Sequence, residues 1–304
     1  MQTNPSPLIV LNALLYYLII IPVSSLPFFI LYRLSDGLYY LFFYLLGYRK
    51  KVVFQNLKNA FPELNEKERL KIAKKFYRHF CDLFVESLKV FTISEKSVKQ
   101  RMQMVNPELV NHYFQQGRSV ILAGGHYNNW ELFAVAIDDL VQHHCIAIYK
   151  PLSNKFFDAR MRETRGKYGL EMISTKSIKA LFEKRSGELN AVIFGADQSP
   201  GNPRSAYWME FLKQDTGVLF GTEKYAREFN IPVLYGRILK LKRGYYTFEV
   251  VPVCDDPAAM EYGAITEAHT RLLEQDIRKD PAYWLWSHRR WKHKRPAAHV
   301  NAPV

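Results

Sequence analysis

A histidine and a carboxylate five residues apart, directly after a short apolar run, are the residues of this chain best suited to chemistry. His126 and Glu131 lie in the decapeptide Gly-Gly-His-Tyr-Asn-Asn-Trp-Glu-Leu-Phe, which follows residues 119–123. The pattern predicts a strand that ends in two glycines and delivers the histidine to the start of the next helix. Enzymes of the α/β class place reactive groups there, outside the carboxyl end of a strand.

The two side chains diverge on a straight helix but can meet across a turn. Residues i and i+5 lie about 140° apart around a regular helix. With His126 in the turn and Glu131 in the first helical turn, the carboxylate can hold one imidazole nitrogen and leave the other as a general base. Ser or Cys nucleophile motifs are missing nearby, so we expect the reacting hydroxyl to belong to a substrate. The alternative is a structural histidine, because His-x4-Glu alone also occurs by chance.

Apolar runs that alternate with helical patterns predict the elements that position this pair. Strands are expected at residues 120–123, 146–149, 191–194, 233–239 and 246–253. Helical spacing appears near residues 130–141, 156–168, 177–184, 221–229 and 265–278. Asn65 with Glu68 three residues later indicates the start of a further long helix. Strands that alternate with helices indicate an α/β fold with a mixed, mostly parallel sheet flanked by helices.

The N-terminal residues predict a hydrophobic membrane-anchor helix. Residues 1–32 carry no charged side chain, and the apolar core at 8–31 exceeds the roughly 20 residues that a span needs. Pro and Ser residues interrupt this core, so a kinked span and a re-entrant helix pair are both open. A buried core helix is the remaining alternative. A cleaved signal peptide fits poorly, because residues 1–7 contain no Lys or Arg.

A second apolar run at residues 37–48 is too short to cross a membrane. We expect it to lie in the interface or to pack on the catalytic domain, and its tyrosines and Arg49-Lys50-Lys51 suit the headgroup zone. Basic residues follow the apolar segment and none precede it, so the bulk of the protein is expected on the cytoplasmic face. Residues 1–48 are then an anchor and interfacial segment, and residues 49–304 a single catalytic domain.

The chain is strongly basic, with 42 Lys and Arg against 29 Asp and Glu and a formal net charge of +13. A dense basic segment covers residues 288–295. This balance favours anionic partners, namely nucleic acid, an anionic lipid surface, a phosphorylated substrate or an acidic carrier protein. With a membrane anchor present, the lipid partners are favoured over nucleic acid.

Cysteine and histidine spacing predicts neither a disulfide framework nor a metal site. The three isolated cysteines are Cys81, Cys145 and Cys254. Without a Cys-x-x-Cys pair they are expected to be buried thiols in a reducing compartment. Histidines at 143–144, or at 288 and 293, lack supporting Cys or acid ligands at suitable spacing for a metal.

Three further segments carry charged or aromatic residues after predicted strands or near the C-terminus. They are Tyr149-Lys150-Pro151, Gly195-Ala196-Asp197-Gln198 and Trp286-Ser287-His288-Arg289-Arg290-Trp291. The first leads into a helix that bears Arg165. Taken singly, each has a structural explanation: a solvated charged face, an Asp that shapes a turn, or an aromatic cluster in the core or at a membrane interface.

Together, in this order and spacing, the segments closely resemble the bacterial lipid A late acyltransferases, the lauroyl/myristoyl family within the lysophospholipid acyltransferase superfamily. The resemblance runs from about residue 49 to residue 294. The family's Gly-His-aromatic-x-Asn-Trp-Glu motif falls on residues 125–131. Two departures are Lys150, where the family has an arginine that can form a bidentate fork, and Phe211-Leu212-Lys213, where it has Phe-Phe-Gly.

The resemblance implies transfer of a fatty acyl chain from an acyl carrier protein thioester to a hydroxyl of a lipid A precursor, at the inner membrane and without metal or cofactor. His126, oriented by Glu131, takes the hydroxyl proton, and the alkoxide attacks the thioester directly. Backbone N–H groups at residues 128–130 are expected to stabilise the oxyanion. Arg165 is expected to neutralise acceptor charge, and Asp197 to orient the acceptor.

The resemblance also implies the remaining contacts and the partners. Substrate-binding residues are expected at Asn129, Lys150, Arg165, Asp197, Gln198, His288, Arg289 and Arg290. The basic surface around residues 289–295 is expected to steer the acidic carrier protein. The partners are thus this carrier protein, an anionic glycolipid acceptor and the membrane, with no nucleic acid.

Two other functions stay open from the sequence. The same chemistry can act on a lysophospholipid or an aminoacyl lipid, with coenzyme A or an acyl carrier protein as donor. A non-catalytic membrane protein that binds anionic lipid or nucleic acid through its basic C-terminal segment is the alternative of another class. The histidine motif at residues 124–131 speaks against it, because a binding module has no need of an oriented base.

Overall fold

A seven-stranded sheet forms the centre of the computed structural model, which describes residues 7–185, 187–297 and 301. The strand order is β1-β9-β8-β2-β5-β3-β4, and only β8 and β9 pair antiparallel. The strands are β1 (Met102–Met104), β2 (Val120–Gly124), β3 (His144–Tyr149), β4 (Glu171–Ser174), β5 (Asn190–Gly195), β8 (Val233–Lys242) and β9 (Tyr245–Cys254). The predicted α/β class and the five predicted strands are confirmed, and the last two of these strands form an antiparallel hairpin. The sequence prediction missed the short strands β1 and β4.

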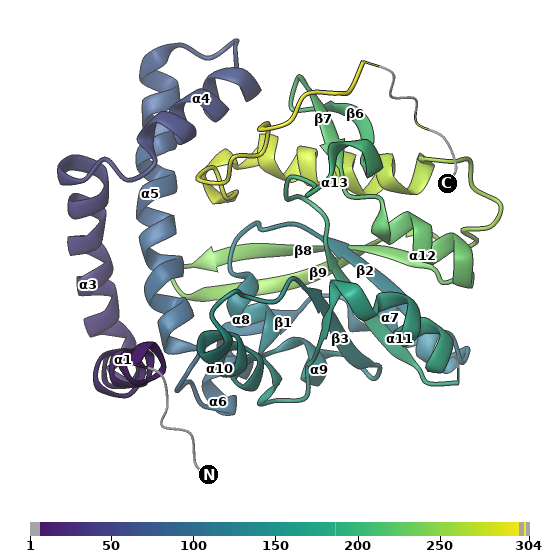
Figure 1. Cartoon of the computed structure of the whole chain (residues 1–304), viewed down its shortest axis with the longest axis horizontal. Helices are drawn as coiled ribbons and strands as arrows, with labels where there is room; N and C mark the ends of the chain where they lie inside the picture. The colour runs from purple at the N-terminus through teal and green to yellow at the C-terminus, as the bar shows by residue number, and fades with distance from the viewer. Residues whose placement is uncertain (1–6, 186, 298–300, 302–304) are drawn as a thin grey trace.

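Helices cover both faces of this sheet (Figure 1). Alternate residues of β2 point to opposite faces, so Leu122 packs with Val110 and Ile137, whereas Ile121 packs with Leu181 and Ala226. The covering helices are α6 (Glu95–Arg101), α7 (Pro107–Gln115), α8 (Trp130–Ala134), α9 (Ile137–Leu140), α10 (Lys155–Gly166), α11 (Ile178–Lys184), α12 (Gly221–Phe229) and α13 (Ala264–Lys279). The predicted helix at 130–141 is therefore two short helices, α8 and α9.

A separate hairpin of β6 (Tyr207–Phe211) and β7 (Gln214–Val218) lies against α13. Its turn requires left-handed backbone at Leu212 and Lys213, with φ of 50° and 61°. These are the positions at which the sequence departs from the family's Phe-Phe-Gly. A glycine at the second turn position would adopt this φ without strain.

The N-terminal segment forms one long apolar helix, built from α1 (Pro7–Leu15), the π-helical turn η1 (Tyr16–Ile20) and α2 (Ile21–Ser25). By length and composition, Leu8–Ser25 is sufficient to cross a membrane. The helix ends at Leu26, which has a φ of −59° and a ψ of 146°, because the residue before Pro27 is disfavoured in helical conformation. The expected apolar core at 8–31 is therefore not a single helix.

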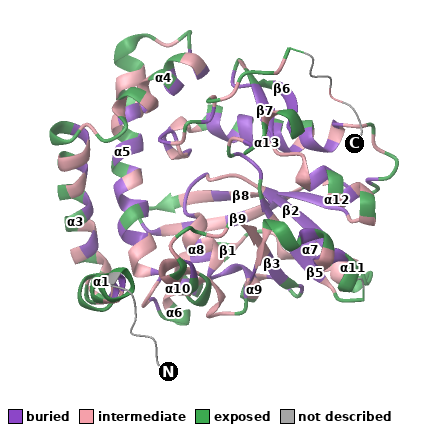
Figure 2. Ribbon diagram, viewed as in Figure 1, coloured by how far each residue is buried: buried purple, intermediate pink, exposed green. Residues whose placement is uncertain are grey.

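A second helix, α3 (Phe28–Tyr40) continued by η2 (Leu41–Leu45), packs along α5 (Glu66–Lys89). Tyr39 and Phe43 are buried in one cluster with Tyr77 of α5. In Figure 1, α3 lies alongside α5 while α1 is seen end-on, and Figure 2 shows exposed residues on the outward sides of both. Residues 37–48 were expected in the membrane interface or packed on the rest of the protein, and the structure shows the segment packed on α5. The helix α4 (Lys50–Ala60) connects η2 to α5.

A buried carboxylate joins α3 to the sheet and to the loop after β2. Glu86 of α5 accepts hydrogen bonds from the Tyr32 hydroxyl at 2.9 Å, the Tyr246 hydroxyl at 2.8 Å and Asn129 Nδ2 at 2.6 Å. Burial raises the pKa of this carboxyl. Because the three donors belong to different elements, Glu86 fixes their relative positions.

Glu86→Ala is expected to lower the free energy of unfolding by roughly 3 kcal/mol, because it leaves three donors unsatisfied in the interior. Tyr32→Phe removes one of these donors together with its hydrogen bond and should cost about 1 kcal/mol. Thermal unfolding of both variants in detergent, followed by circular dichroism, measures the difference. Equal melting temperatures for the two variants would contradict the assignment of Glu86 as a three-way link.

Candidate active site

His126 is held by Asp197, a residue 71 positions further along the chain. The imidazole Nδ1 lies 2.6 Å from Asp197 Oδ1, and the backbone N–H of His126 donates to Asp197 Oδ2 at 2.8 Å. Trp284 Nε1 donates to the same Oδ2 at 2.8 Å. The sequence predicted Glu131 as the carboxylate that holds the imidazole; in the structure Asp197 makes this contact.

The sheet brings these two residues together. Gly124 of β2 and Gly195 of β5 are directly paired in parallel register, and the N–H of Ala196 donates to Gly124 O at 2.9 Å. His126 and Asp197 each follow the paired glycines by two residues. Because the carboxyl ends of parallel strands meet at one edge of the sheet, the register sets the contact.

Two glycines make room for the close approach. A Cβ on Gly125 would lie 2.8 Å from Leu273 Cδ2 and 3.3 Å from Asp197 Cγ. A Cβ on Gly195 would lie 3.4 Å from His126 Cε1, which is ordinary contact. The steric demand is therefore strongest at Gly125, the glycine that directly precedes the histidine.

The loop after His126 is fixed from several sides. Asn128 adopts a left-handed φ of 59°, its N–H donates to Tyr283 O at 3.0 Å, and its Nδ2 donates to Ile238 O at 2.7 Å. The Tyr127 hydroxyl donates to the carbonyl of Asp276 at 3.1 Å. Because the Asn128 N–H is already engaged, it is not available for the oxyanion role that the sequence predicted for residues 128–130.

The charges of the pair reinforce each other. Burial lowers the pKa of His126, but the charge and hydrogen bond of Asp197, with a contribution from Glu131, outweigh burial and raise the pKa above its ordinary value. Burial raises the pKa of Asp197, but His126 and the Trp284 donor outweigh it and hold the pKa at about 2. Asp197 is therefore an ionised carboxylate at neutral pH, and it favours the proton on Nδ1.

The other imidazole nitrogen, Nε2, remains for chemistry. The side chain of His126 is 23% exposed, whereas that of Asp197 is only 3% exposed. The Gln198 amide nitrogen lies 3.2 Å from Nε2, and this residue is exposed. A neutral imidazole with Nδ1 protonated presents an acceptor lone pair at Nε2, which is what a general base needs.

Glu131 is paired with Arg165. Arg165 Nε donates to Glu131 Oε2 at 2.9 Å and Nη2 donates to Oε1 at 2.6 Å, which is a bidentate pair. Trp130 Nε1 also donates to Glu131 Oε1, at 3.1 Å, and the Trp130 ring lies edge-on to the His126 ring at 5.1 Å. The Glu131–Arg165 pair therefore adjoins the imidazole through Trp130.

Two residues expected to bind substrate have structural contacts. Asn129 is buried, and its side chain caps α8 by accepting from the Leu132 N–H at 2.8 Å while it donates to Glu86. His288 Nε2 accepts from the Ser199 N–H at 3.0 Å, and burial lowers the pKa of this histidine to about 4. His288 thus fixes the loop after Asp197 as a neutral acceptor.

The other predicted substrate-binding residues differ in exposure. Lys150 and Arg289 are exposed, the former where β3 ends. Arg290 is buried, so it is not part of the basic surface expected around residues 289–295. Arg295 at the end of this surface is paired with Asp215 at 2.6 Å. The structure therefore leaves fewer unpaired cations on this segment than its sequence suggests.

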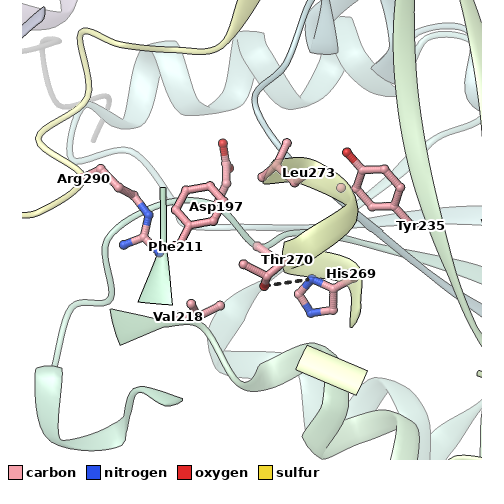
Figure 3. Close-up of a pocket in the computed structure, with 10 residues that line it drawn as sticks. Asp197, Phe211, Val218, Tyr235, His269, Thr270, Leu273 and Arg290 are labelled. Atoms are coloured by element: carbon pink, nitrogen blue, oxygen red, sulfur yellow. Dashed lines mark hydrogen bonds between the residues drawn. The ribbon is translucent and has the colours of Figure 1, made fainter. Parts of the chain in front are cut away.

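A small cavity of about 10 Å³ lies beside Asp197, on the side away from the imidazole of His126. Its lining includes Asp197, Arg290 and three residues of α13, namely His269, Thr270 and Leu273. Figure 3 shows Arg290 and Phe211 on one side and His269 and Thr270 of α13 on the other. Its volume is that of a single water molecule. It is therefore a packing feature behind Asp197 and too small to hold a substrate.

The carboxylate partner of His126 was missed by the sequence analysis, which gave Asp197 a role toward the acceptor. A usable indication is present: Gly195-Ala-Asp and Gly124-Gly-His have the same spacing after two predicted strands. If the two strands are parallel neighbours, residues at the same distance after the strand ends lie side by side at one edge of the sheet. Which strands are neighbours is not given by spacing alone.

The electrostatics predict how His126 titrates. In Asp197→Asn the pKa of His126 should fall below its ordinary value, because burial remains and the carboxylate that raises the pKa is gone. Glu131→Gln should lower the pKa by less. Carbon-13 NMR of histidine-labelled protein, assigned with His126→Gln, measures this directly. An unchanged pKa in Asp197→Asn would contradict the pairing.

Comparison with known proteins places nearly the whole chain in one family. Residues 4–293 match the family described as Bacterial lipid A biosynthesis acyltransferase. The chain is 26% identical over 276 residues to the Lipid A biosynthesis lauroyltransferase of Escherichia coli (strain K12), covering 89% of this chain and 88% of that protein. It is 24% identical over 276 residues to the Lipid A biosynthesis acyltransferase of Haemophilus influenzae, covering 89% and 86%. It is 23% identical over 247 residues to the Lipid A biosynthesis palmitoleoyltransferase of Escherichia coli (strain K12), covering 80% and 79%.

Proposed function

Because the chain belongs to the bacterial lipid A biosynthesis acyltransferase family, we propose that it transfers a fatty acyl chain from an acyl carrier protein thioester to a hydroxyl of a lipid A precursor. The observation that carries the chemistry is the His126–Asp197 pair, with Nε2 of the imidazole open to a substrate. The relatives are named for lipid A biosynthesis and for two different acyl chains. They therefore support the acceptor class and leave the chain length open.

The proposed reaction is a direct acyl transfer. His126 Nε2 accepts the proton of the acceptor hydroxyl, and the hydroxyl oxygen attacks the thioester carbonyl carbon. The carbon–sulfur bond breaks, and the imidazolium returns the proton to the departing sulfur, so the products are an ester and a thiol. Asp197 stabilises the imidazolium between these steps. The Gln198 amide, a donor 3.2 Å from Nε2, marks the position that the donating hydroxyl would take.

The Glu131–Arg165 pair supplies fixed charge beside this base. Glu131 engages Nε and Nη2 of the guanidinium, and within the described part of the chain Nη1 has no hydrogen-bond partner. We assign Nη1 to an anionic group of the acceptor, because a guanidinium meets phosphate well. Glu131 then acts on the base through its charge, which raises the pKa of His126, and through the orientation of Arg165.

The apolar N-terminal helix supports a reaction at a membrane. The bulk of the charged residues follow the apolar Leu8–Ser25 segment. This asymmetry supports a catalytic domain on the cytoplasmic face of the inner membrane, where an acyl carrier protein is available.

The function itself is tested with the purified full chain in detergent. A hydroxyacylated disaccharide lipid should be acylated from the acyl carrier protein thioester, with weaker transfer from coenzyme A and none to a lysophospholipid. Preference for the lysophospholipid would replace the proposed acceptor. Equal use of coenzyme A would remove the proposed donor specificity and leave the acceptor assignment intact.

The base assignment has its own prediction. His126→Gln should lower kcat by ~10²–10⁴-fold, the usual contribution of a general base, and Asp197→Asn should also be strongly impaired. Activity should rise with pH as His126 loses its proton, with the midpoint above the ordinary histidine value because its pKa is raised. In Asp197→Asn and Glu131→Gln the midpoint should move to lower pH. A wild-type pH profile in both would exclude His126 as the titrating base.

The role of Arg165 separates acceptor binding from chemistry. Arg165→Ala should raise the KM for the disaccharide lipid about tenfold or more, the loss of one charge-assisted contact, and change the KM for the donor little. Arg165→Lys should recover only part of the loss, since it lacks the bidentate fork. Arg162→Ala, an exposed residue of the same helix, is the matched control. An effect confined to kcat or to the donor would show that Arg165 does not bind the acceptor.

A further inference from the structure

A second cleft, formed by other residues than the His126–Asp197 pair, lies between α3, α5 and the turn that joins β8 to β9. Figure 1 shows this turn ending beside α5. The volume of the cleft is about 420 Å³, within the usual range of ligand sites. Its lining residues are Asp36, Arg78, Asp82, Lys240, Leu241, Lys242, Arg243 and Tyr283.

The two carboxylates of the cleft are already engaged. Arg243 Nη2 lies 2.6 Å from Asp82 Oδ1 and 2.7 Å from Asp36 Oδ1. Lys240 Nζ lies 3.8 Å from the other oxygen of Asp82. These contacts hold the turn between β8 and β9 against α3 and α5, and they use both negative charges.

Two cations of the cleft remain without a carboxylate partner in the described chain. Arg78 and Lys242 are both exposed, and each lies over an aromatic ring: Arg78 is 5.0 Å from the centre of Tyr39, and Lys242 is 4.4 Å from that of Tyr245. The lining as a whole has four cations against two carboxylates. This excess of positive charge, on side chains held by aromatic contacts, suits an anionic ligand.

The rim of the cleft is partly apolar, and α3 and η2 beside it carry further exposed apolar and aromatic side chains. Leu241, in the strand end between two lysines, is 64% exposed. Tyr40, Tyr44 and Leu45 of α3 and η2 are 60%, 57% and 78% exposed. Exposed aromatic and apolar side chains next to cations are typical of the headgroup zone of a bilayer. The apolar helix at Leu8–Ser25 leads directly into α3.

The positive surface continues along α5. A groove of about 330 Å³ beside the cleft shares Arg78 with it and is lined by Lys67, Leu70, Lys71, Lys74, Lys75 and Arg78. Within the described chain, none of these cations forms an ion pair with a carboxylate. A helix face with cations at this spacing is drawn toward an anionic surface.

We propose that the cleft binds the phosphate headgroup of an anionic membrane phospholipid and gives the protein a second membrane contact beside its N-terminal helix. Arg78 and Lys242 receive the phosphate, and Leu241 enters the bilayer. The apolar rim distinguishes this ligand from an acidic protein, whose docking would leave Leu241, Tyr44 and Leu45 facing water. The proposal goes beyond the acyl transfer reaction, because binding at the cleft requires no turnover.

The cleft is in contact with the loop that carries the base. Tyr283 lines it, and the carbonyl of Tyr283 accepts the Asn128 N–H at 3.0 Å, two residues after His126. A single membrane helix can tilt in the bilayer together with the domain that is packed on it. A second contact at the cleft limits this tilt and sets the direction in which the His126 loop faces the bilayer.

The test places an environment-sensitive fluorophore at Leu241→Cys in the full chain. Labelling is selective because Cys81, Cys145 and Cys254 are buried. The protein is reconstituted in phosphatidylcholine vesicles with and without phosphatidylglycerol, without acceptor or donor. We expect a blue shift of the emission when phosphatidylglycerol is present and its reversal by high salt, because salt screens exposed charges.

Charge reversal assigns the shift to the cleft. Arg78→Glu combined with Lys242→Glu should abolish the blue shift, whereas Lys184→Glu combined with Lys224→Glu, at exposed positions of α11 and α12, should leave it unchanged. If the reversed variant does not fold, Arg78→Gln with Lys242→Gln should reduce the shift.

Three results would overturn the proposal. The first is equal emission in both kinds of vesicle, and the second is a shift that survives reversal of both cleft cations. The third is an equal shift produced in neutral vesicles by acyl carrier protein or by the disaccharide lipid acceptor. Failure of this test leaves the acyl transfer assays unaffected.

Discussion

The contact between His126 and Asp197 is the constraint on which the rest of the site depends. It joins residues 71 positions apart and exists only because β2 and β5 are neighbours with Gly124 opposite Gly195. A shift of one residue in this register would move one side chain to the other face of the sheet. The buried apolar residues of β2 and β5 therefore do more than stabilise the fold: they fix the register at which the base meets its carboxylate.

Each of the two carboxylates at the site has its own basic partner: Asp197 pairs with His126, and Glu131 pairs with Arg165. Asp197 is almost fully buried, and a buried carboxylate without a partner is strongly unfavourable; His126 and Trp284 provide its partners. Glu131 is satisfied by Arg165. With Arg165 on Glu131, only one carboxylate competes for Nδ1, so the imidazole has a defined tautomer, and its Nε2 faces the exposed Gln198. In this structure the His and the Glu of the His-x4-Glu motif therefore do not pair with each other. Each belongs to a separate pair, and the two pairs are adjacent.

The sequence predicted the helices and strands better than it predicted which side chains contact one another at the site. The five main strands were predictable because they are apolar runs bounded by turn residues, whereas the missed strands β1, β4, β6 and β7 each have polar or charged residues within three to five positions. The family resemblance implied substrate-binding roles for Asn129 and Arg290, yet the structure buries both side chains, and Asn129 donates to Glu86. The pairing of His126 was inferred from proximity in sequence. Strand order decides it, and strand order is a long-range property that no local pattern contains.

The N-terminal segment, which contains a helix long and apolar enough to cross a membrane, is coupled to the site. Tyr32 of α3 and Asn129 of the loop after β2 both donate to Glu86, and Asn129 also caps α8, the helix that carries Glu131. Two hydrogen bonds thus separate the helix that follows the apolar span from the start of α8. The proposed division at residue 48 marks a change in composition, while the packing of α3 on α5 continues across it. Since interior hydrogen bonds tolerate little displacement, any force that moves α3 at the bilayer surface must be shared by Glu86 and by the loop that presents His126.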